Sequence, residues 1–408
     1  MSTVTNQFLP PLSSGEIEIT DPDRYEDIDR KQERIAAFLT RRKYDGLLLR
    51  RPCNFAWFTS GAECPRDAAH EPAAALFITP EARVVLADNV DSSQLFDRHL
   101  AGMGFQLKQR PWHEGRSGLL DDLCRGRSVA CDVQQAGATN EAAEIAALRL
   151  PLTALECERL RKLGGIAAHA VEATARNIEL GQTEAEIAGQ LANRLYRHEV
   201  QPLSLRAVAD GRGRSYRRWK FGDNTLRRWC FISATVSRWG LCAGVTRSVV
   251  FGSPPPEMVL AFQQAGMLSA TGMFFSQSGW PLSLVWQKVR RIYEKQGVGD
   301  EWQLADQADV VGYLASEVPM VPTSEFTLLP RMPLHWHPSV GPAQVGDTML
   351  VGEEGCEMVT RPTDWPMLCV TVKGRPVELS DLLVRESGAP ATSVTPPAPA
   401  PSNGSAIS

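Results

Sequence analysis

The chain has 408 residues, of which 43% are hydrophobic and 22% are charged, an ordinary composition for a globular protein large enough for two packed domains. Its net charge of -4 argues against a general nucleic-acid binder. The nine cysteines are an odd number without CxxC pairs, which indicates reduced thiols rather than a disulfide framework or a zinc ribbon.

The two ends of the chain differ in composition from the rest. Residues 1–26 have no apolar run behind a basic leader, so we expect a flexible lead-in, no signal peptide and a cytoplasmic protein. Residues 388–408 are mostly Ala, Pro, Ser and Thr without periodicity, which predicts a disordered tail.

Residues 27–150 alternate helical and strand-like patterns. Apolar residues at helical spacing predict an amphipathic helix over 27–43. Further strand-like or helical runs follow at 46–49, 74–79, 82–87, 92–103 and 141–148. This alternation predicts an α/β domain.

Residues 153–385 form the second predicted domain. A long amphipathic helix is expected over 154–180, and Thr183 with Glu186 forms a capping box for the next helix. Helices are expected over 258–275 and 281–296, before short strands that continue to residue 385.

Residues 229–252 are the most informative stretch of the chain, WCFISATVSRWGLCAGVTRSVVFG. Two apolar runs with strand character flank the break Arg238-Trp239-Gly240, and Gly252 with the following Ser-Pro closes the unit. The pattern predicts a β-hairpin with a polar turn.

This hairpin resembles the metal-binding hairpin of the creatinase, Xaa-Pro aminopeptidase and methionine aminopeptidase superfamily, whose pattern is D-F-G-A-x-Y-D-G-Y-x-S-D-x-T-R-T. Gly240, Cys242, Thr246 and Arg247 keep the frame of that pattern. The resemblance implies an α/β (α+β) chain, in which a creatinase-like N-terminal α/β domain precedes a pita-bread domain. It also implies a homodimer.

Two further segments resemble the same superfamily. The run from Arg51 to Gly61 is similar to the N-x-x-Y-x-T-G strand of creatinase-like N-terminal domains, so we expect a strand there. The turn that holds Thr183 and Glu186 matches a pattern typical of the superfamily, and helix capping alone explains it.

Five positions that carry metal ligands in the superfamily hold other residues here. They are Ser233, Gly244, Asp309, His337 and Gly346. Divalent ions need several oxygen or imidazole ligands at about 2.0 to 2.6 Å, and Ser233, Gly244 and Gly346 offer no charged one. We therefore expect no dinuclear centre, no metal ligands and no cofactor.

Creatinase belongs to the superfamily and splits a C–N bond without metal, through a histidine upstream of the hairpin and glutamates that orient the substrate. No histidine lies between His198 and His335 in this sequence. The resemblance therefore implies that this proton shuttle is absent, unless His335 or His337 replaces it from another wall of the pocket.

The segment His335-Trp336-His337 is the first candidate for a repurposed site. On a strand both imidazoles point to one face, where with Asp309 they would bind a metal or act as a base with an orienting acid. The alternative is that they fill space left by lost ligands. Glu317 completes the candidate catalytic set of His337, Asp309 and Glu317, with a structural hydrogen-bonding role as its alternative.

A basic run between residues 206 and 247 is the second candidate. Guanidinium groups near a vacated metal pocket would hold a carboxylate, a phosphate or the acidic face of another protein. The predicted ligand-binding residues are Arg217, Arg218, Arg238, His335 and Ser233. The alternative is a solvated loop that contacts acids of a dimer partner.

Two classes of function follow. The sequence favours a catalytically silent homologue that binds a small anionic ligand or a protein partner, without contacts to nucleic acid or membrane. The alternative is a metal-independent, creatinase-like hydrolase that cleaves a C–N bond in a small amino-acid derivative. Convergence of His337, Asp309 and Glu317 on one concave pocket would favour the hydrolase.

Overall fold

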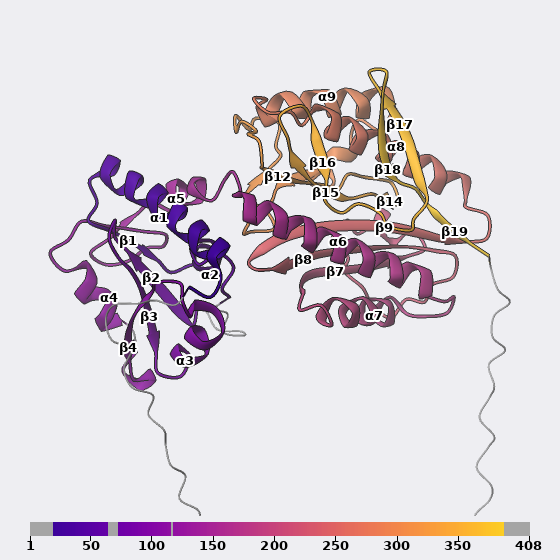
Figure 1. Cartoon of the computed structure of the whole chain (residues 1–408). Coiled ribbons are helices and arrows are strands. Elements are labelled where there is room, and N and C mark those ends of the chain that lie inside the picture. Colours follow the sequence, from indigo (N-terminus) through magenta and orange to yellow (C-terminus); the bar gives the residue numbers. More distant parts are fainter. Residues whose placement is uncertain (1–18, 64–71, 116, 387–408) are drawn as a thin grey trace, which may run out of the picture.

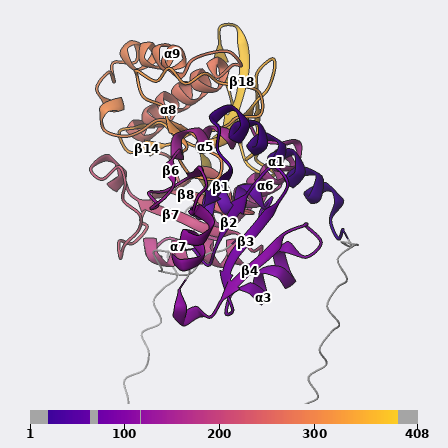
Figure 2. The ribbon, with the colours of Figure 1, turned by 90° about the vertical axis from the view of Figure 1, so that its left-hand side faces the viewer.

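The computed structural model describes residues 19–63, 72–115 and 117–386, which form two domains side by side (Figure 1). Figure 2 looks along the line that joins the domains, with the first domain in front. The predicted tail at 388–408 lies outside the described residues, as does the predicted lead-in up to residue 18.

Helix α1 (Pro22–Arg42) begins five residues earlier than its apolar pattern predicts, inside the predicted lead-in. The Asp21 carboxylate accepts a hydrogen bond from the Arg24 amide at 3.1 Å, and proline is favourable in the first turn of a helix. Capping by polar residues therefore extends the helix beyond its buried, apolar face.

The first sheet has six strands in the order β4-β3-β2-β1-β5-β6, and it mixes parallel and antiparallel pairs. Apolar side chains on its strands are buried in two core clusters. The strands are β1 (Gly46–Leu49), β2 (Ala74–Ile78), β3 (Arg83–Asp88), β4 (Gln106–Arg110), β5 (Val129–Cys131) and β6 (Thr139–Asn140). The helices after α1 are α2 (Pro52–Phe58), α3 (Ser92–Leu95), the π-helix Phe96–Leu100, the 3-10 turn Trp112–Glu114, α4 (Ser117–Cys124) and α5 (Ala142–Leu148).

The prediction of a strand from Arg51 to Gly61 is wrong, because this segment contains helix α2. Pro52 fits the first turn of a helix, and every residue from Asn54 to Phe58 is buried. A short run that is buried on all sides carries no periodicity that distinguishes a helix from a strand.

The second domain begins with helices α6 (Ala154–Asn177) and α7 (Glu184–Tyr196), which pack on the sheet β19-β9-β8-β7. The predicted capping box of Thr183 and Glu186 is confirmed. The strands of this sheet are β7 (Gln201–Ala209), β8 (Trp229–Arg238), β9 (Leu241–Phe251) and β19 (Leu383–Arg385).

The predicted hairpin is confirmed as β8 and β9, joined by Trp239 and Gly240. Both turn residues have positive φ, 54° and 75°, as the tight turns of twisted hairpins require. Gly240 cannot carry a side chain here, since a Cβ would lie 2.9 Å from the Tyr313 ring.

A second sheet, β11-β10-β12-β15-β16, faces this hairpin across the domain, and α8 (Pro256–Phe275) and α9 (Leu282–Lys295) lie on its outer side (Figure 1). Its strands are β10 (Ala308–Val310), β11 (Val318–Pro319), β12 (Pro333–Trp336), β15 (Asp347–Val351) and β16 (Cys356–Met358). The remaining elements are the 3-10 turns Arg212–Arg214 and Glu301–Gln303 and two ribbons, β13 (Ser339–Val340) with β14 (Ala343–Gln344) and β17 (Met367–Val372) with β18 (Arg375–Ser380).

Helix α8 alone among the described helices is long and apolar enough to cross a membrane by length and composition, with a mean hydropathy of 1.2. Its window is 61% buried, and the helix packs on α9 and on both ribbons. These contacts are those of a core helix.

Buried charges tie the two domains together. The Lys31 ammonium on α1 lies 2.6 Å from a carboxylate oxygen of Asp27 and 2.6 Å from one of Glu156 on α6. The Tyr313 hydroxyl, from the second domain, donates to Glu156 at 2.6 Å. Nearby, the Arg149 guanidinium pairs with Glu317, and both side chains are 3% exposed.

Candidate functional site

The five positions that correspond to metal ligands in the superfamily lie close together between the two sheets of the second domain. Ser233 is on β8 and Gly244 on β9, while Asp309, His337 and Gly346 lie on or beside β10, β12 and β15. The strands bring them together across 113 residues of sequence.

Backbone and hydroxyl hydrogen bonds join the hairpin to the second sheet at this place. The Thr246 amide on β9 donates to the Gly346 carbonyl at 2.8 Å, while the Thr246 hydroxyl donates within the hairpin, to the Ser233 hydroxyl on β8, at 2.9 Å. The Gly244 amide donates to the Thr348 hydroxyl at 2.8 Å. These are neutral hydrogen bonds, and they close the two sheets on each other.

The imidazole of His335 fills the space between Gly244 and Gly346. A Cβ on Gly244 would lie 2.5 Å from both ring nitrogens, and a Cβ on Gly346 would lie 3.4 Å from Nε2. The sequence predicts a cavity among these positions, and the structure instead shows that space occupied by a side chain.

His335 is a neutral group in this position. Its side chain is 8% exposed, and Nε2 has no hydrogen-bond partner among the described residues. Burial, with a smaller contribution from the neighbouring His337, lowers the pKa of His335 well below its usual value. The imidazole therefore packs as an uncharged ring.

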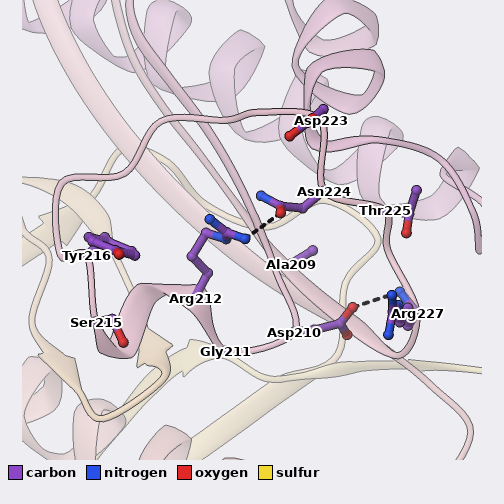
Figure 3. A pocket seen from close by; sticks show the side chains of 10 residues that line it. All are labelled: Ala209, Asp210, Gly211, Arg212, Ser215, Tyr216, Asp223, Asn224, Thr225 and Arg227. Atoms are coloured by element: carbon purple, nitrogen blue, oxygen red, sulfur yellow. Dashed lines mark hydrogen bonds between the residues drawn. The ribbon is translucent and has the colours of Figure 1, made fainter.

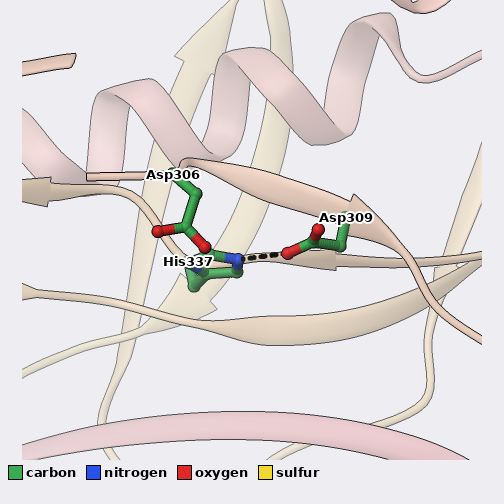
Figure 4. Close-up of side chains that lie close together, drawn as sticks. All are labelled: Asp306, Asp309 and His337. Carbon is green, nitrogen blue, oxygen red and sulfur yellow. Dashed lines mark hydrogen bonds and ion pairs between the residues drawn. The ribbon is translucent and has the colours of Figure 1, made fainter. Parts of the chain in front are cut away.

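His337 and Asp309 form a direct pair, as Figure 4 shows. The distance between His337 Nε2 and Asp309 Oδ2 is 3.0 Å, and the Ser316 hydroxyl donates to Asp309 Oδ1 at 2.5 Å. The rings of His335 and His337 lie 4.6 Å apart, so the two imidazoles share one face as the sequence predicts. Asp306, which the sequence analysis did not single out, completes this group.

Glu317 belongs to a different part of the molecule. Its carboxylate pairs with the Arg149 guanidinium and accepts the Tyr313 amide at 3.0 Å. Arg149 also donates to the side chain of Asn54 in the first domain. Of the three predicted catalytic residues, the structure thus brings His337 and Asp309 together and commits Glu317 to the domain boundary.

The predicted arginines each contact a different carboxylate. Arg217 pairs with Glu301, Arg218 with Asp306 at 3.2 Å and Arg238 with Glu199 at 2.6 Å. Arg217 also keeps Nε and Nη1 buried without a hydrogen-bond partner among the described residues.

Arg206, from the same basic run, is partly buried. It donates to the backbone carbonyls of Trp219 at 2.9 Å and Arg217 at 2.6 Å, so it holds the loop after β7 in place. Burial lowers its pKa to about 10, although Asp306 acts in the opposite direction.

A cavity of about 710 Å³ opens in this loop (Figure 3). Its lining includes Arg212, Arg227, Asp210, Asp223 and Tyr216. Asp210 is already satisfied, because it accepts the backbone amides of Arg227 at 2.8 Å and of Trp229 at 3.1 Å. Arg212 donates to Asn224, as Figure 3 shows.

Comparison with known proteins agrees with this architecture. Residues 158–356 match the model of metallopeptidase family M24, while no curated protein matches the chain. The prolidase from Pyrococcus horikoshii OT3 superposes with a TM-score of 0.70 at 16% identity, covering 82% of this chain and 99% of that one. The dipeptidase PepE from Mycobacterium ulcerans superposes with a TM-score of 0.70 at 15% identity, covering 90% and 100%.

A third similar structure is the N-terminal domain of the FACT complex subunit SPT16 from chickpea, Cicer arietinum. It superposes with a TM-score of 0.65 at 10% identity, covering 83% of this chain and 97% of that one. Together these matches define a two-domain protein whose second domain has the pita-bread fold. Residues 158–356 are thus similar in sequence to metallopeptidase family M24, and the fold of the chain is the one seen in prolidases.

Proposed function

We propose that this protein has lost the dinuclear peptidase centre of its superfamily and functions by binding a small anionic ligand. The observation that carries the proposal is the His335 imidazole between Gly244 and Gly346. A carboxylate at position 244 would need the volume that this ring occupies. In this proposal the dinuclear centre is therefore missing for two reasons, because its charged ligands are replaced and because the His335 ring fills the space that a ligand at position 244 would need.

The shared fold does not decide the activity, because one fold supports many functions. Ser233 and Thr246 use their hydroxyls on each other, and Gly244 and Gly346 supply no side-chain ligand. Two cations held between these strands would lack the anionic oxygens that balance their charge.

The loop cavity beside Arg227 is the place that best suits an anion. Arg227 is exposed, and none of the described acidic side chains pairs with its guanidinium. Asp223, which also lines the cavity, adds a negative charge that disfavours a large polyanion, so a small ligand with one acidic end fits better. A homodimer, a protein partner and a cytoplasmic location stay predictions of the sequence.

A metal-independent C–N hydrolase is the second candidate. The observation that favours it is the 3.0 Å contact between His337 and Asp309, since a carboxylate that orients an imidazole is a common acid–base pair. The Glu317 carboxylate would have to leave Arg149 to take part, and this makes the hydrolase the weaker proposal.

Hydrolysis of Xaa-Pro and methionyl peptides by the full chain, with Mn²⁺ or Co²⁺ and separately with a chelator, tests both proposals. We expect no turnover in either condition. Turnover that requires metal would contradict the loss of the peptidase centre. Turnover in chelator that His337→Ala abolishes would establish the hydrolase instead.

Thermal-shift measurements with carboxylates, phosphates and matched cations test the binding role. We expect stabilisation by anions that weakens as salt is raised, because screening acts over a Debye length of roughly 8 Å at physiological strength. Arg227→Ala should remove the effect and Arg290→Ala, on the distant helix α9, should not. Loss in Arg217→Ala/Arg218→Ala alone would place the anion at the predicted arginines.

A further inference from the structure

Asp306, Asp309 and His337 bring two carboxylates and one imidazole to a common point at the edge of the second sheet (Figure 4). One ligand atom from each of the three lies within 4.8 Å of the other two. We propose that these side chains form a site for a single divalent transition-metal cation such as Zn²⁺, Mn²⁺ or Co²⁺. This departs from the absence of metal ligands that the sequence predicts.

The spacing of the ligand atoms suits one cation. Ligands at about 2.1 Å from an ion lie roughly 3.0 Å apart when they are at right angles. The distance between His337 Nε2 and Asp309 Oδ2 is 3.0 Å. A ligand atom of Asp306 lies within 4.8 Å of the other two, and its side chain is 46% exposed, so it is not held in place by packing.

The charge and chemistry of the group also suit such an ion. Two carboxylates with a neutral imidazole balance a double positive charge, and mixed oxygen and nitrogen ligands are those that these metals accept. The side chains of Asp309 and His337 are only 10% and 13% exposed, so most of the site is shielded from water. The exposed side near Asp306 leaves room for water or a ligand to complete the shell.

The neighbouring residues hold the two inner ligands in place. The Ser316 hydroxyl occupies Asp309 Oδ1, which leaves Oδ2 directed at His337. The ring of His335 packs behind His337 at 4.6 Å. Support of this kind fixes ligand orientation in metal sites.

The proposed site overlaps only part of the two-metal centre of the superfamily. Asp309 and His337 stand at two of the five corresponding positions, Asp306 is a further residue, and Ser233, Gly244 and Gly346 take no part. The proposal therefore predicts one ion per chain. It does not depend on the proposed anion binding, although a bound cation would occupy His337 Nε2 and remove it as a free base.

Arg218 supplies a matched test of the charge at this site. Its guanidinium lies 3.2 Å from Asp306 Oδ1 and its side chain is 86% exposed, so it competes with a cation for the same carboxylate. Removing Arg218 should strengthen metal binding, whereas removing the charge of Asp306 should weaken it.

Calorimetric titration of the chelator-treated full chain with Zn²⁺ and Co²⁺, with the visible spectrum of bound Co²⁺ as a second readout, tests the proposal. We expect one ion per chain, affinity at least about tenfold weaker in Asp306→Asn, and equal or tighter binding in Arg218→Ala. Asp97→Asn, which changes an exposed carboxylate in the first domain, serves as the control and should bind as the parent does.

Three outcomes would overturn the site. These are no binding at micromolar protein, one ion bound with the same affinity in Asp306→Asn, or a Co²⁺ spectrum that His337→Gln leaves unchanged. Two ions per chain, together with metal-dependent peptidase turnover, would instead overturn the proposed loss of the peptidase centre. The two proposals can therefore fail separately.

Discussion

The domain boundary and the surroundings of Gly244, between the two sheets of the second domain, differ in whether their buried side chains are charged. At the boundary, Lys31, Glu156, Arg149 and Glu317 are all at most 3% exposed, and each is paired with an opposite charge. Between the sheets, the residues nearest Gly244 are a neutral imidazole and hydroxyls. At the boundary the buried side chains are charged and paired, whereas the groups that touch Gly244 are uncharged, and the buried charges of Arg247, Asp347 and Glu172 beside Thr246 and Gly346 are paired with one another.

Glu317 is a residue that matches the superfamily pattern but makes its contacts at the domain boundary. Its surroundings match the superfamily pattern, yet its partners are Arg149 and the Tyr313 amide rather than His337 or Asp309. A side chain retained within a sequence pattern can thus serve the assembly of the domains. The chemistry of a position has to be argued from its contacts.

Breaking the charge pair at the domain boundary should have the largest effect. Arg149→Ala leaves Glu317 buried and unpaired, so we expect the free energy of unfolding to fall by about 3 to 5 kcal/mol in chemical denaturation. Arg149→Met/Glu317→Leu should lose less, because no charge is left uncompensated.

The exposed pair Arg290–Glu294 provides the control for that measurement. Its side chains are 57% and 55% exposed, so Arg290→Ala should change the free energy of unfolding by less than about 1 kcal/mol. A loss in Arg149→Ala no larger than in Arg290→Ala would show that the boundary pair does not hold the domains together.

Adding a methyl group between the sheets should have the next largest effect. Gly244→Ala places a Cβ against the His335 ring, and overpacking of this kind lowers the free energy of unfolding by about 1 to 3 kcal/mol. Gly244→Ala/His335→Ala should recover part of the loss relative to His335→Ala alone. If the losses in free energy of unfolding from Gly244→Ala and His335→Ala simply add in the double variant, the His335 ring does not fill the space beside Gly244.

Gly189 on α7 is the matched control, because a Cβ there meets nothing within 4 Å. Gly189→Ala should stabilise the protein by about 0.5 to 1 kcal/mol through helix propensity. A loss of stability in Gly189→Ala would mean that the loss in Gly244→Ala cannot be assigned to the contact with His335.

The smallest effect should come from pH. The folded pKa of His335 lies well below its usual value because of burial, so below about pH 6.5 the unfolded chain binds a proton that the folded chain does not. Stability from this group is complete above pH 6.5 and is lost as the pH falls, by at most about 1.4 kcal/mol per pH unit.

Denaturation of the parent and of His335→Gln between pH 7.5 and 5.5 measures this contribution. Because His337, which lies against the His335 ring, and its partner Asp309 are present in both proteins, the informative quantity is the difference between the two curves. Parallel curves would mean that His335 accepts its proton in the folded state.

Local patterns predicted most of the fold. The hairpin, the Thr183 capping box and the long helices depend on residues near one another in sequence, and the structure confirms them. Helix α2 was missed because its buried run has no period. The order of the superfamily pattern was enough to predict that Ser233, Gly244, Asp309, His337 and Gly346 lie near one another, although it carries no information on their contacts.

The contacts within the site could not be predicted in the same way. Arg149 and Glu317 are 168 residues apart, and nothing local marks them as partners. The direction of the His335 ring depends on the absence of a side chain at Gly244, on another sheet. Asp306 lies three residues before Asp309, and in an irregular segment that spacing does not indicate a shared direction.

The cluster of Lys31, Asp27, Glu156 and Tyr313 has a consequence for how this chain can diverge. Its members come from α1, α6 and a segment of the second domain, and Lys31 is 0% exposed. A single substitution at one of the charged residues would leave its partner buried without a compensating charge. We therefore expect substitutions at these four positions to occur together in related sequences. Substitutions on the surrounding surface should occur independently of one another.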